Sequence, residues 1–422
     1  MSVEALFSDL MQELEHTTTL DTHEHLVTEA EAIAAPRDFY YLFKHYCQAD
    51  LVAAGASPDD LAFFDDQNEA PERRWQDFSP FFNRIRTGAY ARAVMLVIHD
   101  ILDLPDLNDD TCIEVGRRLQ KIAEPGLYHN ILHKQCNITT SILCNRYDNK
   151  EGYPDNFYHL ASSVEVTNIM DKNGVDNLAA KSGISIHSLR DLLECLNKVV
   201  CDWCTDDSVV GIKLGHAYFR SLEFKKRTFY EAETIFNKIL TNELHTLSAH
   251  EAIPLNDFLV YELVARAEAH GMPIAIHTGL QAGNFYRISN TNPLLLQDLL
   301  LEFPRARFDL FHGGMPWVRE IAVLAKYFPG VYLNMAWMHL ISPAQSRSAL
   351  SEWLDIVPNN KIFGFGGDYT KVEKVYGHLV MARRNIAQVL TDKISAAEMS
   401  RQEAGTVIKR LMYDNAAEFY CI

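Results

Sequence analysis

The sequence predicts an α/β fold, a (β/α)8 TIM-type barrel with a helical insertion after its first strand. Three observations favour this fold: short apolar runs recur along the chain, helical patterns separate them, and no linker rich in Pro, Gly or Ser divides the 422 residues. Continuous apolar runs that alternate with helices are typical of parallel strands covered by helices. Eight such strands favour a closed barrel, with an open, doubly wound sheet as the structural alternative.

The predicted strands follow one another along the chain, each bounded by turn residues. Their ranges are 19–23, 139–144, 159–166, 209–214, 273–277, 308–312, 331–335 and 362–365. The second and third have the weakest strand patterns.

Helical patterns fill the long stretch between the first and second predicted strands. Residues 36–54, 71–86 and 109–134 have helical periodicity. We therefore expect residues 31–135 to form a helical insertion, packed over one end of a single barrel that uses residues 1–422. Residues 224–270 also have a helical pattern, and they should supply more than the single helix that usually follows a strand.

The composition indicates an ordinary globular protein and excludes some functions. Hydrophobic residues make up 48% and charged residues 23% of the chain. The net charge of −17 argues against a nucleic-acid partner, which needs a basic surface. The N-terminus lacks the basic and apolar regions of a secretory signal, and no apolar run approaches the roughly 18 residues of a membrane span. We expect a cytoplasmic protein with no membrane partner; a homo-oligomer is compatible with the sequence.

Cysteine offers one alternative kind of site. Cys201 and Cys204 form a C-x-x-C pair, which can mark a redox or zinc site. No second such pair or histidine pair follows at a finger-like spacing, so we favour reduced, buried thiols. The redox alternative predicts a thiolate-dependent activity that survives metal removal.

Side chains that can bind a metal stand at the ends of four predicted strands. His23 and His25 end the first strand, His277 the fifth and His312 the sixth, and Asp368 follows the eighth. Because the carboxyl ends of all barrel strands converge on one face, these residues should meet. Histidines two apart on a strand point to the same side, and imidazoles with one carboxylate favour zinc or a similar metal. We predict one divalent metal held by His23, His25, His277 and Asp368, zinc first and manganese second.

Each of these residues taken alone also fits a purely structural role. The His-x-His pair fits a surface strand, His277 a buried core residue, His312 a turn beside glycines, and Asp368 a helix N-cap. Their joint position at strand ends is what favours a functional site.

Four motifs resemble a known family. DTHEHL, PIAIHTG, FDLFHGG and GFGGDY resemble the metal-binding motifs of the amidohydrolase superfamily, specifically its amidohydrolase-2 branch. The resemblance runs from about Gly211 to the C-terminus, and the region HLVTEAEAIAAPRDFYYLFKHYCQADLVAAGAS resembles uronate isomerases more loosely. It implies that His23, His25, His277 and Asp368 are ligands and that His312 acts on substrate or water.

The predicted activity is that of a metal-dependent hydrolase. A metal-activated water would attack a carbonyl-type carbon of an amide, ester or lactone. Asp368 would take the proton and return it to the leaving group, and His312 would hydrogen-bond the oxygen that gains negative charge. A non-oxidative decarboxylase or a uronate-type isomerase on the same mononuclear site is the alternative reaction. A barrel that binds without catalysis is the alternative of another class.

Residues near other strand ends are candidates for binding a small-molecule substrate. They are Lys213, His216, Tyr218 and Arg220 at strand four, Arg287 after strand five and Trp337 after strand seven. Arginine suits bidentate carboxylate recognition, so we expect a carboxylate on the substrate, with salt bridges as the structural alternative for both arginines. Lys213 could bind that carboxylate or cap the barrel. In carboxylated form it could instead bridge two metals, as in dinuclear members of the family. The alternatives stay open because a shift of one residue in the register of strand four would turn the Lys213 side chain to the other face of the sheet.

Overall fold

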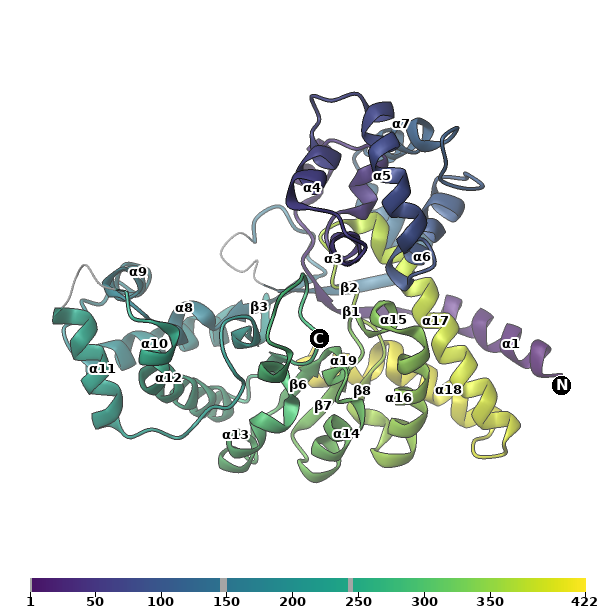
Figure 1. Ribbon diagram of the computed structural model, residues 1–422. Coiled ribbons are helices and arrows are strands. Elements are labelled where there is room, and N and C mark those ends of the chain that lie inside the picture. The colour runs from purple at the N-terminus through teal and green to yellow at the C-terminus, as the bar shows by residue number, and fades with distance from the viewer. Residues whose placement is uncertain (1, 145–149, 242–245) are drawn as a thin grey trace.

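The computed structural model describes residues 2–144, 150–241 and 246–422 (Figure 1). One eight-stranded sheet lies at its centre, and its strands are hydrogen-bonded in sequence order. Every pair of neighbours is parallel. The strands are β1 (Thr19–Glu24), β2 (Ile138–Cys144), β3 (Phe157–Ser162), β4 (Val209–Leu214), β5 (Ile274–His277), β6 (Phe308–Phe311), β7 (Val331–Asn334) and β8 (Ile362–Phe363).

Hydrogen bonds between β1 and the segment after β8 bring the two edges of the sheet together. The Thr22 amide donates to the Phe365 carbonyl at 3.3 Å, and the His25 amide donates to the Tyr369 carbonyl at 3.1 Å. These bonds join the first strand to the segment after the last and give a near-closed barrel, which confirms the predicted fold.

The third strand ends earlier than the predicted range of 159–166. β3 stops at Ser162, and helix α8 (Val164–Thr167) begins two residues later. Ser163 makes the turn, because its carbonyl accepts from the Thr167 amide at 3.0 Å and from the Thr167 hydroxyl at 2.7 Å. Local side-chain bonding of this kind competes with strand pairing, and a hydrophobicity pattern does not record it.

The interior of the barrel is filled by apolar side chains and closed by the C-terminus. Leu20, Leu160 and Ala275 pack with Phe419 and Tyr420 of the C-terminal helix α19 (Asn415–Tyr420). The Tyr420 hydroxyl donates to Oδ2 of the buried Asp309 at 2.6 Å. Because Leu20 and Ala275 lie near the amino ends of their strands, this packing leaves the carboxyl ends free for a site.

The predicted helical insertion is confirmed as a helical region directly after β1. It forms the upper lobe in Figure 1, standing over the barrel. Its elements are α2 (Glu29–Ala34), η1 (Phe39–Phe43), α3 (Tyr46–Ala53), α4 (Pro58–Asp65), α5 (Pro71–Ile85), α6 (Ala89–Leu96), η2 (Val97–Ile101), α7 (Cys112–Ile122) and η3 (His129–Gln135). The rings of Phe39, Phe43 and Phe64 all pack on Phe78, which gives the lobe an aromatic core of its own.

A second group of helices extends beside β3 and β4 (Figure 1). It contains α9 (Lys172–Ser182), α10 (Leu189–Thr205), α11 (Phe229–Thr241) and α12 (Ala249–His270). The expected helical pattern over 224–270 is therefore realised by α11 and α12, and residues 242–245 of it lie outside the described residues. Cys201 and Cys204 lie in α10, and both are partly exposed.

Further helices surround the barrel. They are α1 (Val3–His16), η5 (His216–Tyr218), η6 (Ile288–Thr291), η7 (Pro293–Leu296), α13 (Gln297–Glu302), η8 (His312–Gly314), α14 (Val318–Tyr327), α15 (Met338–Ile341), α16 (Pro343–Ile356), η9 (Asn359–Lys361), α17 (Val372–Ser395), α18 (Arg401–Lys409) and η10 (Arg410–Asp414). Among the described residues, none of the helices combines the length and the apolar character needed to cross a membrane.

Candidate metal centre

The side chains predicted to bind a metal converge at the carboxyl ends of the strands. Asp368 Oδ1 lies 3.0 Å from Nε2 of His23 and 3.3 Å from Nε2 of His25. Asp368 Oδ2 lies 3.8 Å from Nδ1 of His312, whose Nε2 lies 3.0 Å from Nδ1 of His277. Residues more than three hundred positions apart in the chain thus form one cluster, as the barrel geometry predicted.

The three residues whose ligand atoms lie close enough together to hold a metal ion include His312, which was not a predicted ligand. His23, His312 and Asp368 are buried, and one ligand atom of each lies within 4.8 Å of the others. His25 and His277, the other two predicted ligands, flank that group. The arrangement therefore adds His312 to the side chains that could hold a metal.

Burial sets the protonation states of the cluster. It lowers the pKa of His23 and of His277 well below the usual value, and that of His312 to about 4. Burial alone would raise the pKa of Asp368, but the imidazoles of His23 and His25 facing its carboxylate outweigh this effect and hold the pKa well below its usual value. Neutral imidazoles around an ionised carboxylate are the forms that bind a metal ion.

Backbone carbonyls fix which nitrogens of two histidines carry protons. His277 Nε2 lies 3.0 Å from the Leu280 carbonyl, and His312 Nδ1 lies 3.0 Å from the Ala336 carbonyl. Because a carbonyl only accepts, each of these nitrogens must donate. The remaining nitrogens, His277 Nδ1 and His312 Nε2, then carry lone pairs that face each other at 3.0 Å. Two facing lone pairs repel unless a cation lies between or beside them, so this donor set fits a metal.

The loop that carries Asp368 is held by two buried acids. The Gly367 amide donates to Asp21 Oδ1 at 3.0 Å, and the Tyr369 amide donates to Glu24 Oε2 at 2.8 Å. Burial raises the pKa of Asp21 to about 6 and that of Glu24 well above its usual value. A Cβ atom on Gly367 would lie 1.8 Å from Glu24 Oε1, so this position requires glycine.

Several residues around the cluster have a left-handed backbone that is rare outside glycine. The φ angles are +74° at His45, +65° at His312, +61° at Trp337 and +58° at Asp368. Such conformations cost roughly 1–3 kcal/mol each, and they cluster where function requires them. The Tyr46 hydroxyl supports the strained Asp368 by donating to its carbonyl at 2.6 Å.

A cavity of about 390 Å³ opens beside the cluster. Its lining residues are His23, His25, His45, Tyr46, Ser162, Val164, Glu165, Lys213, Gly215, Tyr218, Phe219, His277, Ala282 and Asp368. The predicted site residues did not include His45, Tyr46, Ser162, Glu165 or Phe219. Ser162 could have been found as the last residue of a strand, whereas His45 and Tyr46 come from the insertion and follow no strand.

Lys213 lines this cavity in an unusual state. Only 4% of the residue is exposed, and its Nζ has no hydrogen-bond partner among the described residues. The Nζ atom lies 3.8 Å from the centre of the Phe311 ring. Burial lowers its pKa, which brings the amine closer to its neutral form. An unpartnered buried amine at the end of β4 is a group available to a ligand.

Tyr218 is the other substrate-binding candidate in the cavity lining. Its ring centre lies 4.7 Å from that of His277, and its hydroxyl accepts from the Ala282 amide at 3.2 Å. Tyr218 therefore forms a wall directly against the cluster.

The other four candidates lie outside the lining. His216 is buried with Nε2 3.1 Å from the Thr167 hydroxyl, and Arg220 donates to Asp257 Oδ1 at 2.7 Å. Arg287 is exposed. Trp337 is buried behind the cavity, where it stacks on Tyr46 at 4.4 Å and meets His312 edge-on at 5.5 Å.

Cys144, the last residue of β2, contacts the cluster although it was not among the predicted site residues. Its Sγ lies 2.9 Å from His23 Nδ1. Burial raises the pKa of the thiol to about 12, so it stays protonated. The strand-end criterion applied to His277 would also have selected Cys144.

Comparison with known proteins shows what the chain is similar to. Residues 244–422 match the family described as amidohydrolase. This match covers less than half of the chain. The matched part carries His277, His312 and Asp368, whereas His23 and Lys213 lie before it. The predicted resemblance to that family is confirmed.

One curated relative and two solved structures extend the comparison. Protein FluG of Emericella nidulans is 25% identical over 231 residues, which cover 53% of this chain and 27% of FluG. The chain thus matches only about a quarter of that relative's length. Glucuronate isomerase from Caulobacter crescentus has a TM-score of 0.79 at 18% identity, with 99% of this chain and 94% of that chain covered. Uronate isomerase from Thermotoga maritima has a TM-score of 0.78 at 16% identity, with 99% and 97% covered. At these identities the two structures show a shared fold.

Proposed function

We propose that this protein is a metal-dependent hydrolase of small molecules. His23, His25, His277 and Asp368 would hold one divalent metal, with zinc first and manganese second. The observation that carries the proposal is the position of Asp368, an ionised carboxylate within 3.3 Å of two imidazole nitrogens. It lies on the wall of a cavity of about 390 Å³, where a small substrate can reach it.

The residues of this chain divide the chemical work between them. A divalent metal, when bound, would lower the pKa of water and polarise a carbonyl oxygen. Asp368 would accept a proton from the attacking water and return it to the leaving group of an amide, ester or lactone. Tyr46 and Glu24 would keep that carboxylate in place through their bonds to the Asp368 loop.

The contacts of His312 favour a different role from the predicted oxyanion donor. Its Nδ1 proton is directed to the Ala336 carbonyl, and its Nε2 carries a lone pair. A lone pair binds a metal or accepts a proton, but it does not donate to a developing negative oxygen. We therefore propose that His312 acts as a further ligand or proton acceptor beside His277.

Lys213 is the candidate for binding the substrate's carboxylate. It is the only Lys or Arg among the described lining residues of the cavity, and its Nζ is unpartnered there. The alternative for Lys213, a bridge between two metals, predicts two metal ions per chain instead of one, which elemental mass spectrometry distinguishes.

Uronate isomerisation is the second candidate reaction. It is supported by the likeness of the whole chain, including the insertion, to uronate and glucuronate isomerase structures. A uronate would have to place its carboxylate on Lys213, because no arginine is present in the described lining. We place hydrolysis first because residues 244–422 match a family described as amidohydrolase.

A substrate screen followed by mass spectrometry separates the reactions. Metal-replete protein would be incubated with amides, esters and lactones, and in parallel with uronates and aryl carboxylates. Hydrolysis adds one water to the substrate, isomerisation leaves the mass unchanged, and decarboxylation removes carbon dioxide. We expect the first result, and Asp368→Asn should abolish it. Turnover of uronates or aryl acids with no hydrolysis would refute the hydrolase proposal.

A further inference from the structure

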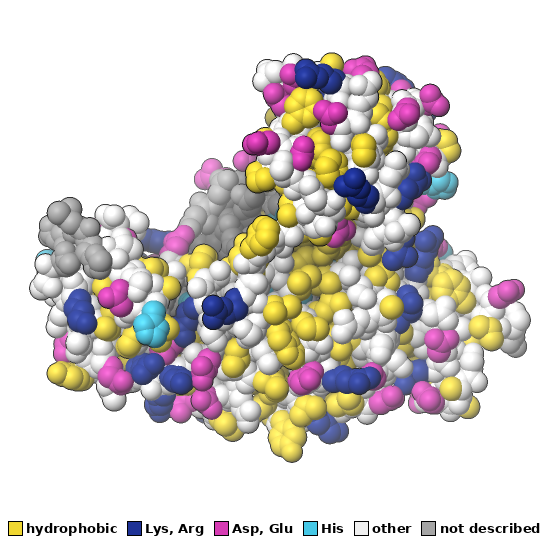
Figure 2. Space-filling model, viewed as in Figure 1, with side chains coloured by type: hydrophobic (Ala, Val, Ile, Leu, Met, Phe, Trp, Pro, Cys, Tyr) yellow, Lys and Arg dark blue, Asp and Glu magenta, His cyan; other side chains and the backbone are white. Residues whose placement is uncertain are grey.

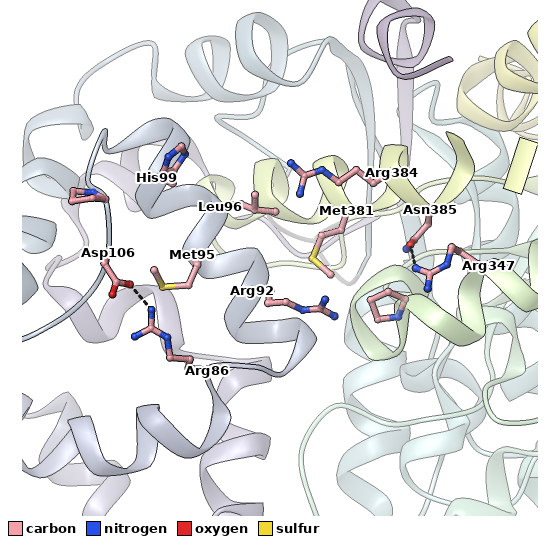
Figure 3. Close-up of a pocket in the computed structure, with 12 residues that line it drawn as sticks. Arg86, Arg92, Met95, Leu96, His99, Asp106, Arg347, Met381, Arg384 and Asn385 are labelled. Atoms are coloured by element: carbon pink, nitrogen blue, oxygen red, sulfur yellow. Dashed lines mark hydrogen bonds and ion pairs between the residues drawn. The ribbon is translucent and has the colours of Figure 1, made fainter. Parts of the chain in front are cut away.

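A second cavity, of about 700 Å³, lies between the helical insertion and the barrel. It shares no lining residue with the metal cavity. Its lining is formed by Arg86, Arg92, Met95, Leu96, His99, Pro105, Asp106, Pro343, Arg347, Met381, Arg384 and Asn385 (Figure 3). These residues come from α6 and its neighbours on the insertion side and from α16 and α17 on the barrel side.

Positive charge dominates this cavity although the chain has a net charge of −17. Asp106 is the only carboxylate among the described lining residues, and it is occupied by Arg86 at 2.6 Å. Arg347 donates to the neutral Asn385 at 2.9 Å, so its charge is not compensated. Arg92 and Arg384 form no ion pair or hydrogen bond with any described side chain. Guanidinium groups thus remain uncompensated in a concave site, where fields from like charges add.

The arginines approach the cavity from opposite sides. In Figure 3 the side chain of Arg92 extends from α6 toward the helix that carries Arg347, and that of Arg384 extends from α17 back toward α6. Figure 2 shows dark blue side chains along the same boundary between the upper lobe and the barrel. A ligand in this gap would contact the insertion and the barrel together.

The same cavity has an apolar surface and one rigid polar anchor. Met95 and Leu96 on α6 and Met381 on α17, which is 7% exposed, supply apolar contact area. Asn385 is 4% exposed, and its Nδ2 lies 3.3 Å from His339 Nδ1. Because Asn385 is fixed on both sides, it holds Arg347 in one orientation before any ligand arrives, which reduces the entropy lost on binding.

We propose that this cavity binds a small organic anion that has an apolar body and at least two phosphate or carboxylate groups. Arginine forms paired hydrogen bonds with the planar carboxylate and with phosphate oxygens. One anionic group would lie between Arg92 and Arg347, and another at Arg384. The proposal is independent of the reaction at the metal centre.

Isothermal titration of the full-length protein would test the proposal with defined probes. ATP represents phosphate-bearing ligands, citrate carboxylate-bearing ones, and adenosine the uncharged control. We expect ATP or citrate to bind and adenosine to bind far more weakly, and whichever anion binds better identifies the group. The double variant Arg92→Gln/Arg384→Gln should weaken that binding by about 10- to 100-fold, as expected for lost charge-assisted hydrogen bonds.

Two control variants test whether the anion binds in this cavity. Arg319→Gln removes a charge from an exposed arginine of α14 that pairs with Glu352, and it should leave the affinity within about twofold of wild type. Asp368→Asn should also retain binding, which excludes the metal centre as the anion site. The proposal is overturned if neither anion binds wild type at millimolar concentration. Equal weakening by the double variant and by Arg319→Gln would also overturn it.

Discussion

The Asp368 amide donates to the carbonyl oxygen of His23 at 2.7 Å, while the side chains of the same two residues meet at 3.0 Å. One hydrogen bond that joins the first strand to the segment after the last therefore also places the carboxylate against the imidazole. Closure of the barrel and assembly of the metal centre depend on the same backbone contact.

Metal content is the first prediction. Wild-type protein should contain about one divalent transition metal per chain, and His277→Ala and Asp368→Ala should lose it because each removes a proposed ligand. Elemental mass spectrometry measures this, with His99→Ala, an exposed histidine remote from the cluster, as control. About two metals per chain would instead make Lys213 a bridging ligand. No metal in any sample, even after reconstitution, would contradict the metal centre.

Lys213→Gln tests the carboxylate-binding role of Lys213. For a carboxylate-bearing substrate we expect KM to rise by about 10- to 100-fold with a smaller change in kcat, because a charged hydrogen bond to bound substrate is lost. The uncharged ester or amide of the same compound should be affected much less. Equal losses with charged and uncharged substrates, together with a fall in metal content, would favour the bridging role.

Gly367→Ala should displace the loop that carries Asp368, because the added Cβ would overlap the Glu24 carboxylate. We expect a loss of roughly 1–3 kcal/mol in the free energy of unfolding and weaker metal binding. Denaturant unfolding and metal titration measure the two effects. Gly174→Ala, in α9, is the matched control. Its added Cβ would lie 3.6 Å from the nearest atom, a side-chain carbon of Ile169, which is an ordinary contact, so the free energy of unfolding should stay unchanged or rise slightly. An unchanged metal affinity in Gly367→Ala would show that the loop is not tightly constrained.

The buried histidines away from the cluster predict that stability falls with acid. Burial lowers the pKa of His339 to about 4 and that of His216 to about 3, from 6.5. Below pH 6.5 these histidines therefore bind protons in the unfolded chain but stay neutral in the folded chain. The free energy of unfolding decreases as the pH falls from 6.5 toward 4.

Urea unfolding at several pH values between 7 and 4.5 would measure that decrease. His339→Gln should reduce the slope of the unfolding free energy against pH by an amount that corresponds to up to about one bound proton. If His339→Gln follows the same pH dependence as wild type, His339 is not a buried neutral group.

The sequence by itself determined the barrel and the meeting of the cluster. Apolar runs ending in His23, His277 and His312 have the local periodicity of parallel strands, and strands of one barrel present their carboxyl ends to one face. The predicted ranges differ most at β3, where Thr167 bonds to the Ser163 carbonyl and starts helix α8, and at β8, which ends at Phe363.

Only the tertiary structure decided which side chains share the site. In the folded protein Lys213 lines the cavity, and Arg220 forms an ion pair with Asp257. Tyr46 reaches from the insertion to the loop that carries Asp368. Arg92 lies beside barrel helices with no carboxylate as its ion-pair partner among the described residues. Periodicity reports the environment of a residue along its own strand or helix. Strand register and the packing of distant helices decide its partners, and those depend on contacts that no local pattern contains.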